Sequence, residues 1–342
     1  NFATVPTVTE ALIKRAKHPT YGYFNIRDEY YDSIIKWHRD RKGVTDLTKE
    51  EIGYENGVLG GVASALHVLC SQGDNILVHS STYIGFTGVL NNNGYHIIHS
   101  PLQKDENGIW RMDFEDMEKK IVDNKIHTAI FCRVWEGWEI EKAMEIYEKH
   151  DVYVIADEIW SDIILGDHKH IPTQSVSEYA KMHTAAFYAP SKTFNLAGLI
   201  GSYHVIYNKW LRERIEKESS LGHYNSMNVL GAYSPEGNEW VDELRQVIGE
   251  NVDYACNYIE KHFEGVEVSR PQGTYMLFLD CEKWCKAHDK TLEELLVSGF
   301  EAGVFWQNGE AFQKKWAIRM NLALPLSRVK EAFDRLDKYV LN

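Results

Sequence analysis

The chain has 342 residues, 44% hydrophobic and 25% charged, a balance that predicts a soluble globular protein with one large domain or two of ordinary size. Its 50 acidic and 37 basic side chains leave a formal net charge of −13, which repels phosphate backbones, so we expect no nucleic acid partner. The sequence has neither an apolar run of about 18 residues nor a leader pattern, so we expect no membrane association and a cytoplasmic location.

The five cysteines are few and irregularly spaced, which indicates reduced thiols rather than a disulfide framework. Cys281 and Cys285 could share a helix face with a metal ion, but no second Cys/His pair has zinc-like spacing. We therefore expect structural thiols and no metal site.

Two helical patterns come first in the chain, one that starts after Pro6 and Thr7 and lies within residues 1–17, and one at 30–42. The loop between them, HPTYGY at 18–23, is rich in turn residues and aromatic rings. From the residues alone, Tyr21 and Tyr23 are expected to pack against the protein.

A glycine-rich turn, GYENGVLGG at 53–61, leads into a helix that we expect to end near Gly73. Free backbone N–H groups at a helix start can bind a phosphate. The turn matches neither a Walker loop nor a dinucleotide fingerprint. By itself it fits a phosphate site and close helix packing equally well.

The middle of the chain alternates strands and helices, which predicts a mostly parallel sheet with helices on both faces. We expect strands at 75–80, 95–100, 128–132, 152–156, 184–188 and 202–207, and helices near 83–91, 113–122, 139–150 and 209–221.

Ligands bind at the carboxyl ends of strands in such sheets. ADEIWSD at 156–162 and APSKTFNLAGL at 189–199 both follow buried strands, so Asp157 and Lys192 should meet in one crevice. An Asp that holds a protonated ring nitrogen, with a Lys that forms a Schiff base, is what pyridoxal phosphate (PLP) requires of a protein. Tyr83 follows another strand and could stack on the ring.

The last third predicts a smaller α+β domain. A long helix at 239–263 precedes strands at 266–269 and 274–280 and helices that start at 291 and 327. We expect a large domain at 28–222, a connection at 223–238, and a smaller domain made of 1–27 and 239–342.

The two motifs, with IRMNLA at 318–323, resemble the aminotransferase superfamily of PLP fold type I. Within it, the chain looks most like the cystathionine β-lyase, or C–S lyase, branch of the MalY/PatB type, over nearly its whole length. The resemblance implies an α/β PLP-transferase fold: a large domain with a mostly parallel sheet between helices, plus a smaller α+β domain. It also implies a homodimer with shared active sites.

The resemblance also implies roles for individual residues. Lys192 would carry the cofactor and remove the substrate's α proton, and Asp157 would hold the ring nitrogen. Arg319 would bind the substrate's α-carboxylate. The remaining cofactor contacts would come from Gly57, Val58, Leu59, Ser191, the stacking Tyr83, and Tyr23 of the neighbouring subunit. Trp160 could donate to the phenolic oxygen, although packing explains it as well.

Each of these residues also has a plainer interpretation. Tyr83 would be an ordinary core side chain, and Asp157 a helix cap. Lys192 and Arg319 would be surface charges. The shared motifs favour the functional roles.

The chain departs from the family pattern in two places. Relatives carry Ser-Pro-x-Asn-Pro-x-Gly where this sequence passes from Cys132 directly to Arg133, so the asparagine is absent or a segment is missing, and 225–231 could be shortened similarly. Aspartate-type aminotransferases usually have Ser or Thr three residues before the lysine and Arg eight after it. Here these positions are Ala189 and Ile200, which favours the lyase.

We therefore expect a PLP-dependent C–S β-lyase that cleaves cystathionine or a cysteine conjugate to pyruvate, ammonia and a thiol. A class I/II aminotransferase is the alternative. A third hypothesis is a protein that binds the cofactor without turnover.

Overall fold

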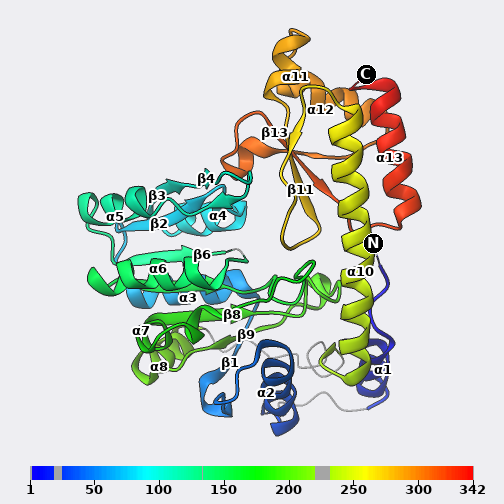
Figure 1. Cartoon of the computed structure of the whole chain (residues 1–342). Coiled ribbons are helices and arrows are strands. Elements are labelled where there is room, and N and C mark those ends of the chain that lie inside the picture. The colour runs from blue at the N-terminus through cyan, green and yellow to red at the C-terminus, as the bar shows by residue number, and fades with distance from the viewer. Residues whose placement is uncertain (1, 19–24, 133, 220–231, 342) are drawn as a thin grey trace.

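A seven-stranded sheet forms the larger part of the molecule. The computed structural model describes residues 2–18, 25–132, 134–219 and 232–341 (Figure 1). The strand order is β1-β9-β8-β7-β6-β2-β3, and neighbours are parallel except β9, which runs antiparallel to β1 and β8. The strands are β1 Ile52–Glu55, β2 Asn75–Ser80, β3 His96–Pro101, β6 Thr128–Phe131, β7 Tyr153–Asp157, β8 Thr184–Tyr188 and β9 Ser202–Val205.

Helices cover both faces of this sheet, because its central strands are apolar on both sides. Along β7, Val154 and Ala156 belong to one core and Ile155 belongs to the other. Successive side chains of a strand point to opposite faces, which produces this division. The helices here are α2 Asp28–Lys42, α3 Val58–Leu69, α4 Ile84–Asn92, α5 Phe114–Asp123, α6 Gly137–Lys149, α7 Glu178–His183 and α8 Lys209–Glu218.

The long helix α10, Pro235–His262, runs beside this sheet and continues to a smaller antiparallel one (Figure 1). The smaller sheet has the order β10-β11-β13-β12 and a core of its own. Its strands are β10 Glu267–Val268, β11 Met276–Asp280, β12 Gln307–Asn308 and β13 Ala317–Asn321, and its helices are α11 Glu282–Ala287, α12 Leu292–Glu301 and α13 Leu326–Tyr339.

Short elements complete the chain. Helix α1, Pro6–Ala16, lies near the lower part of α10 in Figure 1. The other pieces are the β4–β5 hairpin at Gln103–Lys104 and Trp110–Arg111, and the 3-10 helices η1 Lys49–Glu51, η2 Thr173–Ser175, η3 Ala197–Leu199 and η4 Gly309–Phe312.

The predicted strand and helix alternation of the large sheet is confirmed, and several elements differ from the expectation. Strand β1 was missed inside the glycine-rich turn; a Cβ at Gly53 would lie 2.2 Å from the His204 ring of β9, so only glycine fits there. Helix α10 begins at Pro235 rather than 239, because the Ser234 hydroxyl caps it by accepting from Gly237 N at 3.0 Å. Strand β10 is shorter than expected.

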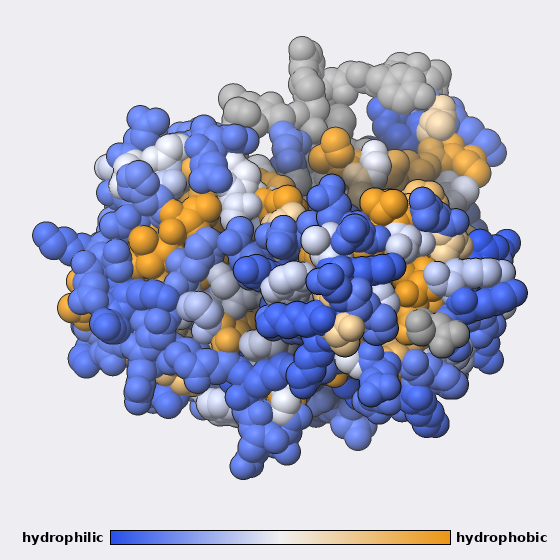
Figure 2. Space-filling model, turned by 90° about the horizontal axis from the view of Figure 1, so that it is seen from above, coloured by the Kyte–Doolittle hydropathy of each residue, from blue (hydrophilic) through white to orange (hydrophobic). Residues whose placement is uncertain are grey.

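The molecular surface carries mostly polar side chains on the face in Figure 2, with hydrophobic residues in small separate patches. None of the helices in the described part of the chain has the length and apolar character needed to span a bilayer.

Candidate active site

Asp157 and Lys192 emerge at the same edge of the large sheet. Strand β7 ends at Asp157, and β8 lies beside it in parallel with Asp157 level with Phe187. The segment that follows β8 therefore leaves the sheet at this edge and carries Lys192. The charge of Lys192 acts to lower the pKa of Asp157, which is consistent with a position near that carboxyl group.

The Asp157 carboxylate is buried, with 7% of the residue exposed, and is poorly supplied with donors. Its Oδ1 accepts from Ile159 N at 3.0 Å, and no other described residue donates to it. Burial raises the pKa of Asp157 to about 7, against the lowering effects of Ile159 N and Lys192. A cationic ring nitrogen would supply the partner that this carboxylate lacks.

Lys192 lies on a tight bend closed by backbone hydrogen bonds from Phe194 N to Pro190 O and from Leu196 N to Ser191 O, both 2.9 Å. Phe194 anchors the bend, because its ring is fully buried. Among the described residues, none forms a hydrogen bond or ion pair with the Lys192 amine. The amine is therefore available to a carbonyl ligand.

The predicted phosphate turn opens helix α3. Gly57 precedes the helix with φ +86°, a conformation that favours glycine. No described residue accepts from the N–H groups of Val58 and Leu59. A Cβ added at Gly85 would meet both the Tyr83 ring and Leu59, at 2.3 and 2.9 Å, so Tyr83 lies next to this turn.

A cavity of about 270 Å³ brings together three more of the predicted residues, Tyr83, Trp160 and Arg319. Arg319 comes from β13 of the smaller sheet, and its Nη1 donates to Gln307 Oε1 at 2.8 Å. Its guanidinium lies 4.6 Å from the centre of the Phe312 ring. Burial lowers the pKa of Arg319, with Tyr83 and Tyr275 acting against this effect. The cavity thus has in its wall residues that follow strands of the large sheet and residues of the smaller sheet, including a partly buried cation.

Trp160 packs its ring edge-to-face on Tyr275, with centroids 4.9 Å apart, so it has the packing role as well as a place in the cavity wall. The lining of this cavity does not include the other predicted residues, which are Gly57, Val58, Leu59, Asp157, Ser191 and Lys192. Of these, Leu59 lies next to Tyr83 of the cavity wall.

Some predictions concern residues outside the described parts of the chain. Tyr23 is one of them, and Arg133 of the Cys132–Arg133 junction is another. The segment 225–231 is also outside.

The sequence did not reveal a buried hydrogen-bonded cluster beside the lysine bend. It is centred on Asp162 and is called the clamp below. Lys42 Nζ lies 2.8 Å from Asp162 Oδ1, which also accepts from Trp37 Nε1 at 2.9 Å, while Thr193 Oγ1 donates to Asp162 Oδ2 at 3.1 Å. Burial acts to raise the pKa of Asp162, but Lys42 and Trp37 overcome it and lower this pKa to about 2. Asp162 was visible in the ADEIWSD motif, whereas its partners on α2 carried no signal.

The residues present fit pyridoxal phosphate. The site offers a buried carboxylate with one donor, a lysine without a described partner, and open N–H groups at a helix start. These three features suit a ring nitrogen, an aldehyde and a phosphate in turn.

Comparison with known proteins agrees with this assignment. The family model for aminotransferase class I and II matches residues 1–336. Cystathionine beta-lyase PatB from Bacillus subtilis (strain 168) is 29% identical, with 98% of this chain and 89% of PatB covered.

Two solved structures are similar along their length. A PLP-bound protein from Clostridium difficile 630, assigned as an aminotransferase, is 33% identical with a TM-score of 0.91, covering 100% of this chain and 90% of that one. The PLP-bound C–S lyase from Staphylococcus hominis is 26% identical with a TM-score of 0.90, covering 98% and 90%.

The chain therefore belongs to the aminotransferase class I and II family. The predicted family and its α/β fold class are confirmed.

Proposed function

We propose that this protein is a PLP-dependent C–S β-lyase that acts on an amino acid with sulfur at its β carbon. The observation that carries the proposal is that Asp157 and Lys192, whose amine has no partner among the described residues, lie at the carboxyl edge of the large sheet. The name of PatB, cystathionine beta-lyase, supports the choice of reaction. The PLP in two similar structures supports the cofactor.

Each part of the cofactor has residues that suit it. Asp157 would pair with the ring nitrogen, Tyr83 would lie on the ring, and Trp160 would line the pocket. The phosphate would lie on the N–H groups at the start of α3 and on the Ser191 hydroxyl, with Gly57, Val58 and Leu59 forming the turn. When bound, PLP supplies an electron sink for the electron pair left on the substrate's α carbon.

The residues of the chain would divide the remaining work. The Lys192 amine removes the proton from the α carbon as a general base. Arg319 binds the α-carboxylate by charged hydrogen bonds and so fixes which bond faces the base. The sulfur then leaves the β carbon as a thiolate.

Two positions near Lys192 favour the lyase over an aminotransferase. Ala189 is buried, with 4% of the residue exposed, and its methyl group cannot hydrogen-bond to the cofactor. Ile200 is exposed, so neither position supplies the polar contact usual in aspartate-type aminotransferases. The assignment of the C. difficile protein keeps amino transfer as the second candidate.

The test supplies the PLP-loaded protein with cystathionine and measures pyruvate and free thiol. The lyase predicts both products without any added keto acid. Amino transfer that depends on a keto acid, without pyruvate release, would support the aminotransferase instead. If protein that retains PLP shows neither pyruvate release nor amino transfer, the result would support cofactor binding without turnover.

Arg319 provides a matched pair of variants for the substrate. Arg319→Lys keeps the charge but loses the two-pronged geometry, and Arg319→Gln loses both. We expect KM to rise in that order while PLP remains bound. An unchanged KM in Arg319→Gln would exclude the carboxylate role.

We further propose a homodimer in which Tyr23 reaches the neighbouring subunit's phosphate site, with the domain division at 28–222, 223–238, and 1–27 with 239–342. The family resemblance supports both. We also propose a cytoplasmic location, which the five free cysteines support. Sedimentation measures the dimer, and Tyr23→Phe should release PLP faster from it. Unchanged PLP retention would remove Tyr23 from the site.

A further inference from the structure

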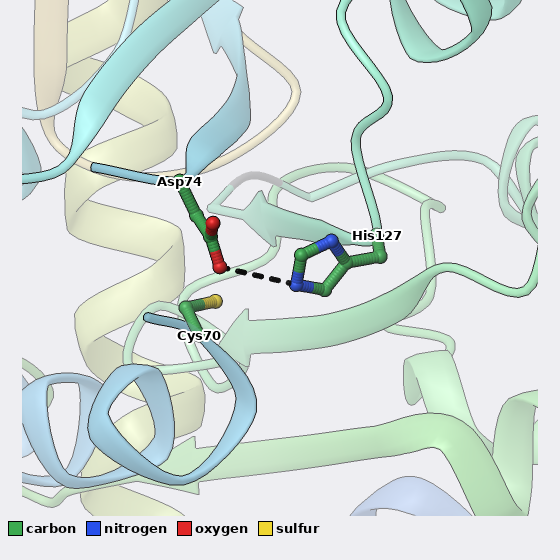
Figure 3. Close-up of side chains that lie close together, drawn as sticks. All are labelled: Cys70, Asp74 and His127. Atoms are coloured by element: carbon green, nitrogen blue, oxygen red, sulfur yellow. Dashed lines mark ion pairs between the residues drawn. The ribbon is translucent and has the colours of Figure 1, made fainter. Parts of the chain in front are cut away.

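Three potential metal ligands meet at the opposite edge of the large sheet. Cys70 caps the end of α3, Asp74 immediately precedes β2, and His127 immediately precedes β6 (Figure 3). Strands β2 and β6 are parallel, with Leu77 level with Ala129, and this register brings the two strand starts together. The cluster therefore lies at the amino ends of the strands, away from the proposed active site.

The ligand atoms converge on a common space. One atom from each of the three residues, the thiol sulfur, a carboxylate oxygen and an imidazole nitrogen, lies within 4.8 Å of the others. His127 Nε2 and Asp74 Oδ2 are 3.4 Å apart (Figure 3). Ligands about 2.0–2.2 Å from a tetrahedral zinc ion are separated by about 3.3–3.5 Å, so this pair already has a suitable spacing.

The protein holds two of the three ligands in place. Ser71 N donates to Asp74 Oδ2 at 2.7 Å, and the Cys70 thiol donates to Thr128 Oγ1 at 3.2 Å. Outer hydrogen bonds such as the one to Asp74 orient metal ligands. The bond at Cys70 would reverse when the thiol loses its proton, because the Thr128 hydroxyl can donate to a thiolate. The carbonyl end of α3 also places negative partial charge beside Cys70, which favours a cation.

We propose that Cys70, Asp74 and His127 bind a divalent transition metal ion, with zinc as the best match. Sulfur, nitrogen and carboxylate oxygen are the ligands that zinc takes in proteins. His127 is partly exposed, with 46% of its side chain accessible, so water can complete the coordination. The Cys70 thiol loses its proton to solvent when the ion binds.

An ordinary ion pair between His127 and Asp74 is the competing explanation. It accounts for two of the three residues, whereas the Cys70 sulfur, which donates to Thr128 Oγ1, also lies within 4.8 Å of the other two ligand atoms. The convergence of a sulfur, a nitrogen and an oxygen atom on one space is the observation that favours a metal site over this ion pair. The proposal is independent of the C–S lyase reaction.

The test uses the PLP-loaded protein after chelator treatment, equilibrated with zinc and measured by elemental analysis. The variant His127→Gln removes one ligand at a partly exposed position, and Cys70→Ser removes the sulfur. His150→Gln is the matched control, because His150 Nε2 lies 2.9 Å from Glu118 Oε1 and forms a histidine–carboxylate pair elsewhere.

We expect about one zinc ion per chain in the wild type and His150→Gln, and at least tenfold weaker binding in His127→Gln and Cys70→Ser. Cobalt in place of zinc should give a thiolate absorption that Cys70→Ser abolishes. Equal zinc binding by wild type and His127→Gln would overturn the proposal. An equal loss of zinc binding in His127→Gln and His150→Gln would also overturn it.

Discussion

Asp157 and Asp162 are buried carboxylates on the same segment, yet their surroundings act on them in opposite directions. Asp157 accepts one described hydrogen bond, and burial raises its pKa to about 7. Asp162 accepts from Lys42, Trp37 and Thr193, and these contacts outweigh burial and lower its pKa to about 2.

The contrast distinguishes a carboxylate that is suited to a ligand from one that stabilises the fold. A buried carboxylate with few hydrogen-bond donors costs stability. Its presence beside Lys192, which has no partner among the described residues, favours a functional role. Asp162 instead connects α2 to Thr193, the residue after Lys192. Through Thr193, the fully hydrogen-bonded Asp162 thereby positions Lys192, whose charge acts on Asp157.

The largest expected effect concerns Lys192, which belongs with Asp157 in this comparison. Lys192→Ala removes the proposed base, and we expect pyruvate formation from cystathionine to fall by at least about 10³-fold. Borohydride reduction followed by peptide mass analysis should attach PLP to the wild-type lysine and to no site in the variant. Lys209→Ala, at an amine with 79% of its side chain exposed, is the control. Residual activity within tenfold of wild type would refute the role of Lys192.

At the Lys42–Asp162 ion pair, Lys42→Met should reduce the stability of the protein more than its activity. Lys42 and Asp162 have 2% and 3% of their side chains exposed, and removal of one partner from such a pair costs about 3–5 kcal/mol. Urea unfolding of the protein measures the loss. The double variant Lys42→Met/Asp162→Asn should recover part of it, since no unpaired charge is left. Equal stability of the single and double variants would contradict a clamp.

The two sides also differ in how far the sequence revealed them. Asp157 and Lys192 could be predicted because each follows a buried strand, and parallel strands bring their carboxyl ends to one edge. Lys42 could not, because a lysine at the end of an amphipathic helix is ordinarily solvated. Its partner lies far along the chain, and only the packing of α2 on the sheet brings them together.

Other features depended on pairing that local patterns do not encode. Strand β1 was missed because IGYE is short and glycine-containing, and its strand character comes from β9. Cys70 and His127 meet through the β2–β6 register, which the spacing of the residues does not specify. Of the cavity residues, Arg319 was found through a family motif, whereas Tyr83 was also indicated by its position after a predicted strand.

Asp157→Asn tests whether the pKa of Asp157 is raised, in contrast to the lowered pKa of Asp162. The raised pKa means that folded protein binds a proton that unfolded protein has released between about pH 4 and pH 7, so this group makes stability fall as pH rises. The quantity to compare is the free energy of unfolding of the variant minus that of wild type, both without cofactor. This difference should be more positive at pH 8 than at pH 5 by a few kcal/mol. Urea unfolding at both pH values measures it. A pH-independent difference would show that Asp157 titrates normally.

Thr193→Val gives the smallest effect and tests the link between the two sides. It removes the 3.1 Å hydrogen bond to Asp162 Oδ2 while it keeps the shape of the side chain, and we expect a loss of about 1 kcal/mol. Thr193→Ser retains the hydroxyl and should lose less. Because Asp162 keeps Lys42 and Trp37, its carboxylate stays ionised, so any change in PLP affinity reflects the position of the lysine bend. Unchanged PLP affinity and stability in Thr193→Val would mean that the clamp holds α2 without positioning Lys192.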